Sequence, residues 1–446
     1  MGACCSKEGN HGSYRDRQIC ECEQGCEEES QVMKGDCGAS IRIQGFSDYV
    51  SMATQQGKKG INQDAMTVWE DFTGEKGVYF CGVFDGHGPS GHKVARRARD
   101  QLPMKLSAAQ KLLHTNGRSQ SDVDAFYEYE DDEEAESSDY VDASEDFDAY
   151  SVFYSWKTNF MRSFKDVDKE LSLDASIDSY CSGTTAVTIV KQGDNLIIGN
   201  LGDSRAVMCT IGEKQEVIPV QLTVDLKPSL PQEAERVKRC NGRVFSLTEE
   251  PAVLRLWLPD EDCPGLAMTR AFGDFCLKDC GLISIPQVFY RKLSPQDEFV
   301  VLATDGVWDV LTNFEVVKIV LAAKKRSMAA KFLVAHAVRA WKSRFPSSKT
   351  DDIAVVCLFF KPPPPLEPSS DMSDNTWDSL SHLNSSVSQC THKSAGSFKL
   401  KLEDLSENMS EDWGERETLV DTTLNFPRNR KNRSKAKFGL RKSAEA

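Results

Sequence analysis

One stretch of this chain reads Gly77-Val-Tyr-Phe-Cys-Gly-Val-Phe-Asp-Gly-His-Gly88. Residues 77–84 are mostly apolar and rich in β-formers, and turn residues bound them, so we predict a short buried strand. The Asp85-Gly86 step ends this strand. Asp-Gly is also the strongest short signal for a hairpin turn, so this step taken alone indicates only a turn.

Two further aspartates stand at the ends of strand-like runs. Asp305 follows the run at residues 298–303, and Asp351 precedes the run at residues 353–360. Loops at strand ends project carboxylates into a shared cleft, and clustered aspartates repel one another unless a cation neutralises them. Hard oxygen ligands favour Mg²⁺ or Mn²⁺ over zinc. Together with Asp85, these residues predict a site for such a cation.

The remaining pattern mixes strands with helices. The adjacent runs 184–190 and 195–200 are joined by turn residues, which predicts a hairpin and an antiparallel sheet. Thr312-Asn-Phe-Glu315 has the spacing of a capping box and opens an amphipathic run that extends to Lys325. Residues 329–344 repeat the helical period. The predicted fold class is α+β.

Composition divides the chain into three parts. Residues 1–40 are polar and rich in Cys, Glu and Gly, which predicts a flexible tail. Residues 41–360 carry the patterns of one domain, and the proline run that follows them cannot continue a sheet. Residues 361–446 are rich in Pro, Ser and Asn, become basic near the end, and predict a second flexible tail. An acidic stretch near residues 119–150 predicts a disordered surface insertion, because like charges at this density repel.

Charge and hydropathy exclude several classes. The formal net charge of -14 opposes general binding to nucleic acid, because a phosphate backbone repels an acidic surface. The sequence contains no run of about 18 apolar residues, so no transmembrane helix is predicted. The N-terminus lacks the apolar part of a secretory signal. We therefore expect a cytoplasmic protein, with the nucleus as a second location, and reduced cysteines.

A zinc knuckle in the Cys-rich N-terminal tail is an alternative to lipidation, but paired Cys-x-x-Cys spacing is lacking.

The N-terminus carries a lipidation pattern. Met1-Gly-Ala-Cys-Cys-Ser6 fits N-myristoylation at Gly2, and Cys4 and Cys5 stand where palmitate can be added. One myristoyl chain binds membranes only marginally, so a second acyl chain is needed for stable attachment. The pattern predicts a peripheral plasma-membrane pool. The basic segment 428–437 is compatible with contact to anionic lipid, with a nuclear signal, or with a solvated tail.

Several motifs, taken in their order, resemble the type 2C metal-dependent protein phosphatases, and plant members of that family in particular. One such motif is a weak signal, but many in the family's order are a strong one. They cover most of the region from about residue 58 to about residue 358. The matching stretches are Asn62-Gln-Asp64, Val83-Phe-Asp-Gly-His-Gly88, Ser182-Gly-Thr-Thr-Ala186, Gly202-Asp-Ser-Arg205, Lys227-Pro228, Thr269-Arg-Ala-Phe-Gly-Asp274, Thr304-Asp-Gly-Val-Trp-Asp309 and Asp351-Asp352.

The resemblance implies two antiparallel β-sheets packed face to face, with helices on both outer faces. It also implies a pair of Mg²⁺ or Mn²⁺ ions. Asp85 would bridge both ions and Gly86 would bind one of them through its backbone carbonyl. Asp305 and Asp351 would complete the pair from the opposite sheet. A water held between such ions loses a proton near neutral pH and attacks phosphorus in line, so no cysteine nucleophile is needed.

The resemblance assigns further roles around the ions. Asp64 would act close to the metals, either directly or by orienting their waters. Asp203, with Asp305, matches the place where some members hold a third, weaker ion. On local sequence alone, a turn in which Arg205 pairs with Asp203 is an alternative. His87 would protonate the leaving serine oxygen.

Two positions depart from the family pattern. Many members carry an acidic residue where this chain has Gln63 and an arginine where it has Lys59. Gln63 offers a carbonyl oxygen without charge, and Lys59 attracts phosphate as a point charge without a bidentate fork. Residues 243–265 match the family's flap beside the active site, and a mobile loop with Trp257 packed onto the domain is the alternative.

The sequence therefore predicts a monomeric enzyme that hydrolyses phosphoserine and phosphothreonine in phosphoprotein substrates and acts in signalling. An alternative from another class is a membrane-tethered pseudophosphatase that binds phosphoproteins or kinases. Gln63 and Lys59 favour this alternative, whereas the retained metal-binding aspartates oppose it.

Overall fold

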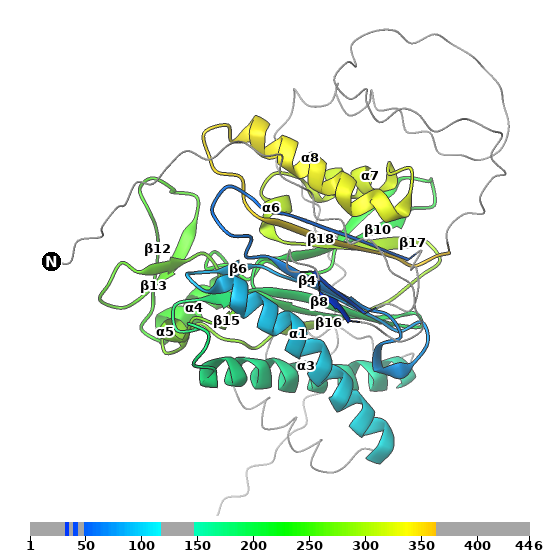
Figure 1. Cartoon of the computed structure of the whole chain (residues 1–446), viewed down its shortest axis with the longest axis horizontal. Helices are drawn as coiled ribbons and strands as arrows, with labels where there is room; N and C mark the ends of the chain where they lie inside the picture. Colours follow the sequence, from blue (N-terminus) through cyan, green and yellow to red (C-terminus); the bar gives the residue numbers. More distant parts are fainter. Residues whose placement is uncertain (1–31, 35–38, 43–48, 117–146, 363–446) are drawn as a thin grey trace, which may run out of the picture.

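The computed structural model describes residues 32–34, 39–42, 49–116 and 147–362, and two β-sheets pack face to face between helices (Figure 1). The first sheet has the strand order β1-β2-β4-β5-β8-β9-β16, and the second has the order β11-β10-β17-β18-β3. Within these sheets β2 runs parallel to β4, whereas the other neighbouring strands run antiparallel. The predicted α+β sandwich is confirmed.

The strands of the first sheet are β1 (Val32–Lys34), β2 (Ala39–Arg42), β4 (Ala65–Trp69), β5 (Tyr79–Phe84), β8 (Ala186–Gln192), β9 (Asn195–Leu201) and β16 (Gln287–Lys292). Those of the second are β3 (Val50–Gln55), β10 (Arg205–Ile211), β11 (Val217–Gln221), β17 (Asp297–Ala303) and β18 (Ile353–Phe359). Both sheets end in loops that carry the aspartates of the sequence motifs.

Strand β5 shows how side-chain alternation builds the layers. Cys81 and Val83 are fully buried and join an apolar cluster contributed by both sheets. Phe80 and Phe84 point to the opposite face, where they join the cluster between the first sheet and its helices. Successive side chains of a strand point to opposite faces, so a continuous apolar run is required where both faces are covered. Burial of each such phenylalanine contributes roughly 1.5–3 kcal/mol.

Helices cover both outer faces of the sandwich (Figure 1). The long helices α1 (Gly91–Asn116) and α3 (Phe147–Leu173) pack on the first sheet. Helices α7 (Asn313–Leu321) and α8 (Ala329–Arg344) pack on the second. In α1 the buried apolar residues recur every three or four positions, which places them on one face of the helix.

Shorter elements complete the described chain. Two small sheets have the strand orders β12-β13-β14 and β15-β7-β6. The short elements are η1 (Phe72–Gly74), β6 (Gly86–His87), β7 (Gly183–Thr184), α4 (Pro231–Arg239), β12 (Arg243–Ser246), β13 (Leu254–Trp257), β14 (Pro264–Leu266), β15 (Phe272–Gly273), α5 (Phe275–Lys278), α6 (Asp305–Trp308) and η2 (Arg326–Met328). Within the described residues, no helix combines the length and the apolar character needed to cross a membrane.

Some predicted boundaries differ from the structure. The β8–β9 hairpin and helix α8 lie where the sequence placed them. Helix α7 begins at the predicted capping box but ends at Leu321 instead of Lys325, because the chain turns there into η2 and α8. Strand β1 lies within the segment assigned to the N-terminal tail, where it pairs with β2.

Several predicted segments lie outside the described residues. These are residues 1–31 with the lipidation pattern, most of the acidic stretch, and nearly all of the C-terminal tail. The acidic stretch ends in the described part of the chain, because helix α3 begins at Phe147.

The capping box at the start of α7 gives a first prediction. Thr312 Oγ1 accepts a hydrogen bond from the Glu315 backbone N–H (3.3 Å), and Glu315 Oε2 accepts one from the Thr312 N–H (2.7 Å). Thr312→Ala removes the side-chain acceptor, and we expect a loss of about 1 kcal/mol in the free energy of unfolding. Chemical denaturation measures this loss, with exposed Ser347→Ala as the control. An unchanged stability in Thr312→Ala would show that water replaces the cap without cost.

Candidate active site

Five aspartates converge at one end of the sandwich because of the strand directions. Asp85 follows β5 and Asp203 follows β9, whereas Asp64 precedes β4. Strands β5 and β9 each run antiparallel to β8, and β4 runs antiparallel to β5, so these ends share one edge of the first sheet. In the second sheet, Asp305 follows β17 and Asp351 precedes its antiparallel neighbour β18. The predicted carboxylates therefore meet across the two sheets.

Mutual repulsion shows that these carboxylates are close neighbours. Burial raises the pKa of Asp85 well above its usual range, and the charges of Asp305, Asp64 and Asp351 raise it further. Burial, followed by the charges of Asp309 and Asp203, likewise raises the pKa of Asp305 well above its usual range. A set of this kind is stable in its ionised form only when cations lie beside it.

Two lysines supply part of the compensating charge. Lys59 Nζ forms an ion pair with Asp351 Oδ2, and Lys227 Nζ lies 3.5 Å from Asp203 Oδ2. Burial lowers the pKa of Lys59, but Asp351, Asp305 and Asp85 outweigh this effect and raise the pKa overall. Asp203 Oδ1 is buried and has no hydrogen-bond partner among the described residues. Two ammonium groups therefore leave most of the carboxylate charge uncompensated.

The donor set fits a hard divalent cation. Its side-chain atoms are carboxylate oxygens, which are the ligands that Mg²⁺ and Mn²⁺ prefer. Within the described ranges, no three His, Cys, Asp or Glu side chains already stand at the spacing of a metal-binding group. The Lys59 ammonium lies against Asp351, one of the expected ligands.

Gln63 lies beside the first turn of α1. Its buried Oε1 has no hydrogen-bond partner in the described part of the chain, and a Cβ added to Gly91 would lie 2.2 Å from it. A Cβ added to Gly86 would lie 2.5 Å from the Gly91 carbonyl oxygen. Glycines at both positions thus allow three backbone segments to meet next to Asp85. The neutral oxygen predicted at Gln63 does face this junction.

His87 belongs to a second polar group beside the carboxylates. Its Nε2 lies 2.6 Å from Asp274 Oδ2, and its Nδ1 is buried without a hydrogen-bond partner among the described residues. Burial lowers the pKa of His87, but the charge and hydrogen bond of Asp274 outweigh this effect and raise the pKa overall. A Cβ on Gly183 would lie 2.0 Å from Asp274 Oδ2, so glycine is required there. The pair can hold a proton on the imidazole near neutral pH.

Two residues that matched motifs without an assigned role prove to organise the site. Asp274 holds His87, and Asp352 accepts backbone N–H bonds from Gly57 (2.7 Å) and Gln63 (2.9 Å). Asp352 thereby fixes the loop that carries Lys59. The sequence indicated a role for both aspartates only by placing them in stretches that resemble the family's motifs.

Arg205 forms a different pair from the alternative considered for its turn. Its guanidinium donates to both carboxylate oxygens of Asp225, at 3.0 and 2.7 Å, and to Asn313 Oδ1 at 2.9 Å. Asp203 is therefore left to face Lys227 and the other site aspartates.

The flap predicted at residues 243–265 forms most of the three-stranded sheet β12-β13-β14. Trp257 stacks on Phe245 with ring centroids 4.8 Å apart, and its indole N–H donates to the Phe245 carbonyl. Trp257 thus packs within the flap.

Buried Glu233 on α4 binds the guanidinium groups of Arg236 and Arg270, and these contacts lower the pKa of Glu233 to about 2 despite burial.

Comparison with known proteins identifies a single family. The family model described as Protein phosphatase 2C matches residues 151–342. The probable protein phosphatase 2C 73 of Oryza sativa subsp. japonica is 53% identical, over 82% of this chain and 81% of that protein. The probable protein phosphatase 2C 65 of Arabidopsis thaliana is 51% identical, over 80% of this chain and 88% of that protein.

Solved structures show the same architecture. A serine-threonine phosphatase 2C from Toxoplasma gondii superimposes with a TM-score of 0.57 and 26% identity, over 70% of this chain and 94% of that chain. A sex determining protein of C. elegans has a TM-score of 0.52 at 20% identity, over 72% of this chain and 67% of that chain, and supports the fold alone.

Proposed function

This chain belongs to the protein phosphatase 2C family and is a serine/threonine protein phosphatase, and we propose that it hydrolyses its phosphoprotein substrates with two divalent metal ions during signalling. The observation that carries the proposal is the convergence of five aspartates with too little positive charge beside them. Divalent cations would supply the missing charge.

This placement supports the set of ligands that the family resemblance implies. Asp85 and the Gly86 carbonyl would hold the ions from the first sheet, and Asp305 and Asp351 from the second. Asp64 would stay close to them, because Thr304 Oγ1 donates to its Oδ2 (2.8 Å) and fixes its orientation. Asp203, together with Asp305, would hold a third ion. When bound, Mg²⁺ or Mn²⁺ lowers the pKa of bound water and neutralises phosphoryl oxygens.

The other side chains bind the phosphate and move a proton. His87 would donate a proton to the leaving serine or threonine oxygen, and Asp274 would orient its ring and favour the protonated form. Lys59 would attract the phosphate as a point charge. Its ammonium lies against Asp351 and its side chain is more than half exposed, so the side chain has room to turn toward an incoming anion.

Metal removal tests the proposal. The full chain, purified and assayed on a phosphothreonine peptide with Mn²⁺, should release phosphate, and EDTA in excess should stop the release. Restoring Mn²⁺ should restore the rate, which controls for unfolding by the chelator. Turnover that is unaffected by EDTA would contradict the metal mechanism. Specific peptide binding without any turnover in Mn²⁺ or Mg²⁺ would support the pseudophosphatase alternative.

We propose that the N-terminal pattern places part of the protein at the plasma membrane through myristate on Gly2 and palmitate on Cys4 or Cys5. The adjacent acceptors in the sequence support this proposal. Gly2→Ala removes the first acyl chain and should move a fluorescently tagged full chain into the cytoplasm. Ser6→Ala tests whether Ser6 contributes to recognition by the acyltransferase. An unchanged distribution of Gly2→Ala would remove the proposal.

A further inference from the structure

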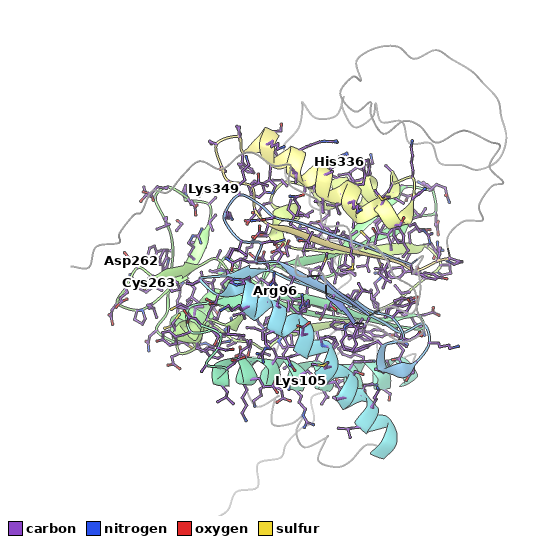
Figure 2. All side chains as sticks on the ribbon, viewed as in Figure 1. Arg96, Lys105, Asp262, Cys263, His336 and Lys349 are labelled. Carbon is purple, nitrogen blue, oxygen red and sulfur yellow. The ribbon has the colours of Figure 1, made fainter. Side chains whose placement is uncertain are left out.

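A surface cavity of about 400 Å³ lies between the first turns of α1 and the loop that follows α3. Figure 2 labels Arg96, one of its lining residues, on α1. The lining residues are Lys93, Arg96, Arg97 and Asp100 from α1 with Ser176 and Ile177 from the loop. The four helical residues stand at positions i, i+3, i+4 and i+7, so they share one face of α1. The cavity thus has a cationic wall made by one helix face.

Two of the cations in this wall lack an internal counter-ion. Arg97 Nη2 pairs with Asp174, and Asp100 accepts two bonds from Arg99, both at 3.0 Å. The side chains of Lys93 and Arg96, by contrast, have no hydrogen-bond or ion-pair partner in the part of the chain that the structure describes. In a protein whose formal net charge is -14, this local surplus of positive charge is distinctive. It predicts an anionic ligand.

The positive charges of this wall also act on the neighbouring His92. Burial lowers the pKa of His92, and the positive charges of Arg96 and Lys93 lower it further. The opposite wall is fixed in advance, because Asp174 accepts hydrogen bonds from the Ser176 N–H (3.0 Å) and hydroxyl (2.5 Å). A wall that is already ordered loses little conformational entropy when a ligand binds.

The cavity lies close to the catalytic aspartates. Helix α1 begins at Gly91, whose carbonyl oxygen would lie 2.5 Å from a Cβ on Gly86. Arg96 follows five residues later, which is about 7.5 Å along the helix axis. The length of the Arg96 side chain adds to this rise, so the guanidinium lies at least one helical turn beyond the helix end that stands beside Gly86. An extended peptide spans about 3.3–3.6 Å per residue, so a few residues beyond the hydrolysed position are enough to run along this part of α1.

Building on the phosphatase activity proposed above, we propose that Lys93 and Arg96 bind a second phosphate of a multiply phosphorylated protein substrate, a few residues from the phosphoresidue that is hydrolysed. A guanidinium fork and an ammonium group match the oxygens of a phosphate dianion. The site would raise the affinity for substrates phosphorylated at clustered positions and leave the chemical step unchanged.

Kinetics on paired peptides test this proposal. One peptide carries a single phosphothreonine, and its partners add a non-hydrolysable phosphonate analogue of phosphoserine at each position up to five residues on either side. With the full chain and Mn²⁺, we expect the peptide with the best spacing to have a KM about tenfold lower at constant kcat. One charge-assisted contact to a phosphate raises the affinity by about this factor. The double variant Lys93→Gln/Arg96→Gln should return KM to the value of the singly phosphorylated peptide.

A matched control removes the same charge elsewhere. Lys324 and Lys325 are exposed and follow α7, which covers the opposite sheet, so Lys324→Gln/Lys325→Gln should keep the tenfold difference. High salt should reduce the difference in the wild type, because exposed charges are screened. Equal KM values for all peptides in the wild type, or a preference that survives Lys93→Gln/Arg96→Gln, would overturn the proposal.

A binding measurement separates this site from the activity. Fluorescence anisotropy of a labelled peptide with phosphonates at both positions should show about tenfold weaker binding to Lys93→Gln/Arg96→Gln than to the wild type. The difference in binding is expected even if the protein hydrolyses no peptide. An absence of hydrolysis would contradict the proposed function and leave the proposed phosphate site untouched. If the double variant instead loses binding to phosphatidylserine vesicles and keeps its peptide affinity, the cavity recognises lipid and the substrate proposal is wrong.

Discussion

Asp305→Asn is expected to abolish turnover and, at the same time, to raise the melting temperature of the metal-free protein. Asp305 lies among carboxylates that raise its pKa, so the neutral amide relieves repulsion when no cation is bound. We expect a melting temperature about 2 °C higher in EDTA. Loss of a metal ligand should lower kcat on a phosphothreonine peptide by about 1,000-fold or more.

The two readouts make this prediction sharp. Mn²⁺ should raise the melting temperature of the wild type and have a smaller effect on Asp305→Asn, because ligand binding to the folded state is stabilising. Exposed Asp194→Asn removes the same charge in the β8–β9 turn, at the opposite end of the first sheet, and should leave both quantities unchanged. A lower melting temperature for Asp305→Asn in EDTA would show that Asp305 stabilises the fold through a contact other than a cation.

His87→Gln should slow the hydrolysis of phosphothreonine peptides by about 1,000-fold, within the range of general acid catalysis. The threonine alkoxide needs a proton to leave, and His87 is the group that Asp274 holds in its protonated form. A nitrophenolate leaves without a proton, so hydrolysis of p-nitrophenyl phosphate should fall by less than about tenfold. The measurement is kcat for both substrates at saturating Mn²⁺.

Two variants control this comparison. Asp274→Asn keeps the ring in place with a neutral partner and should show the same substrate dependence with a smaller loss. His336 lies on α8, on the far side of the other sheet, and His336→Gln should leave both rates unchanged (Figure 2). Equal losses on the two substrates for His87→Gln would assign His87 to positioning and not to proton donation.

Local pattern was enough to predict the strands and the aspartates at their ends. The β5 run and the Asp85-Gly86 step are contiguous in sequence, so period and turn chemistry report on them directly. The capping box of α7 was predicted for the same reason. The end of α7 was not, because it depends on where α8 must begin.

Local sequence patterns did not predict which residues the site residues contact. His87 and Asp274 are 187 positions apart, and Asp352 holds Gly57 across 295 positions. The first pair depends on the small sheet β15-β7-β6 and the second on the pairing of β18 with β3, and a local sequence period carries no information about such long-range pairings. Arg205 shows the same limit, since its partner is Asp225 and not the adjacent Asp203.

The ion pair between Lys59 and Asp351 couples two binding events at this site. A divalent cation held by Asp351 would release the lysine ammonium, and a phosphate that attracts the ammonium would release the carboxylate. Each event removes part of the free-energy cost of the other, so by thermodynamic linkage the cation and the phosphate each raise the affinity for the other by the same factor. With the proposed metal ligands, a lysine at this position would make the protein respond cooperatively to metal and substrate.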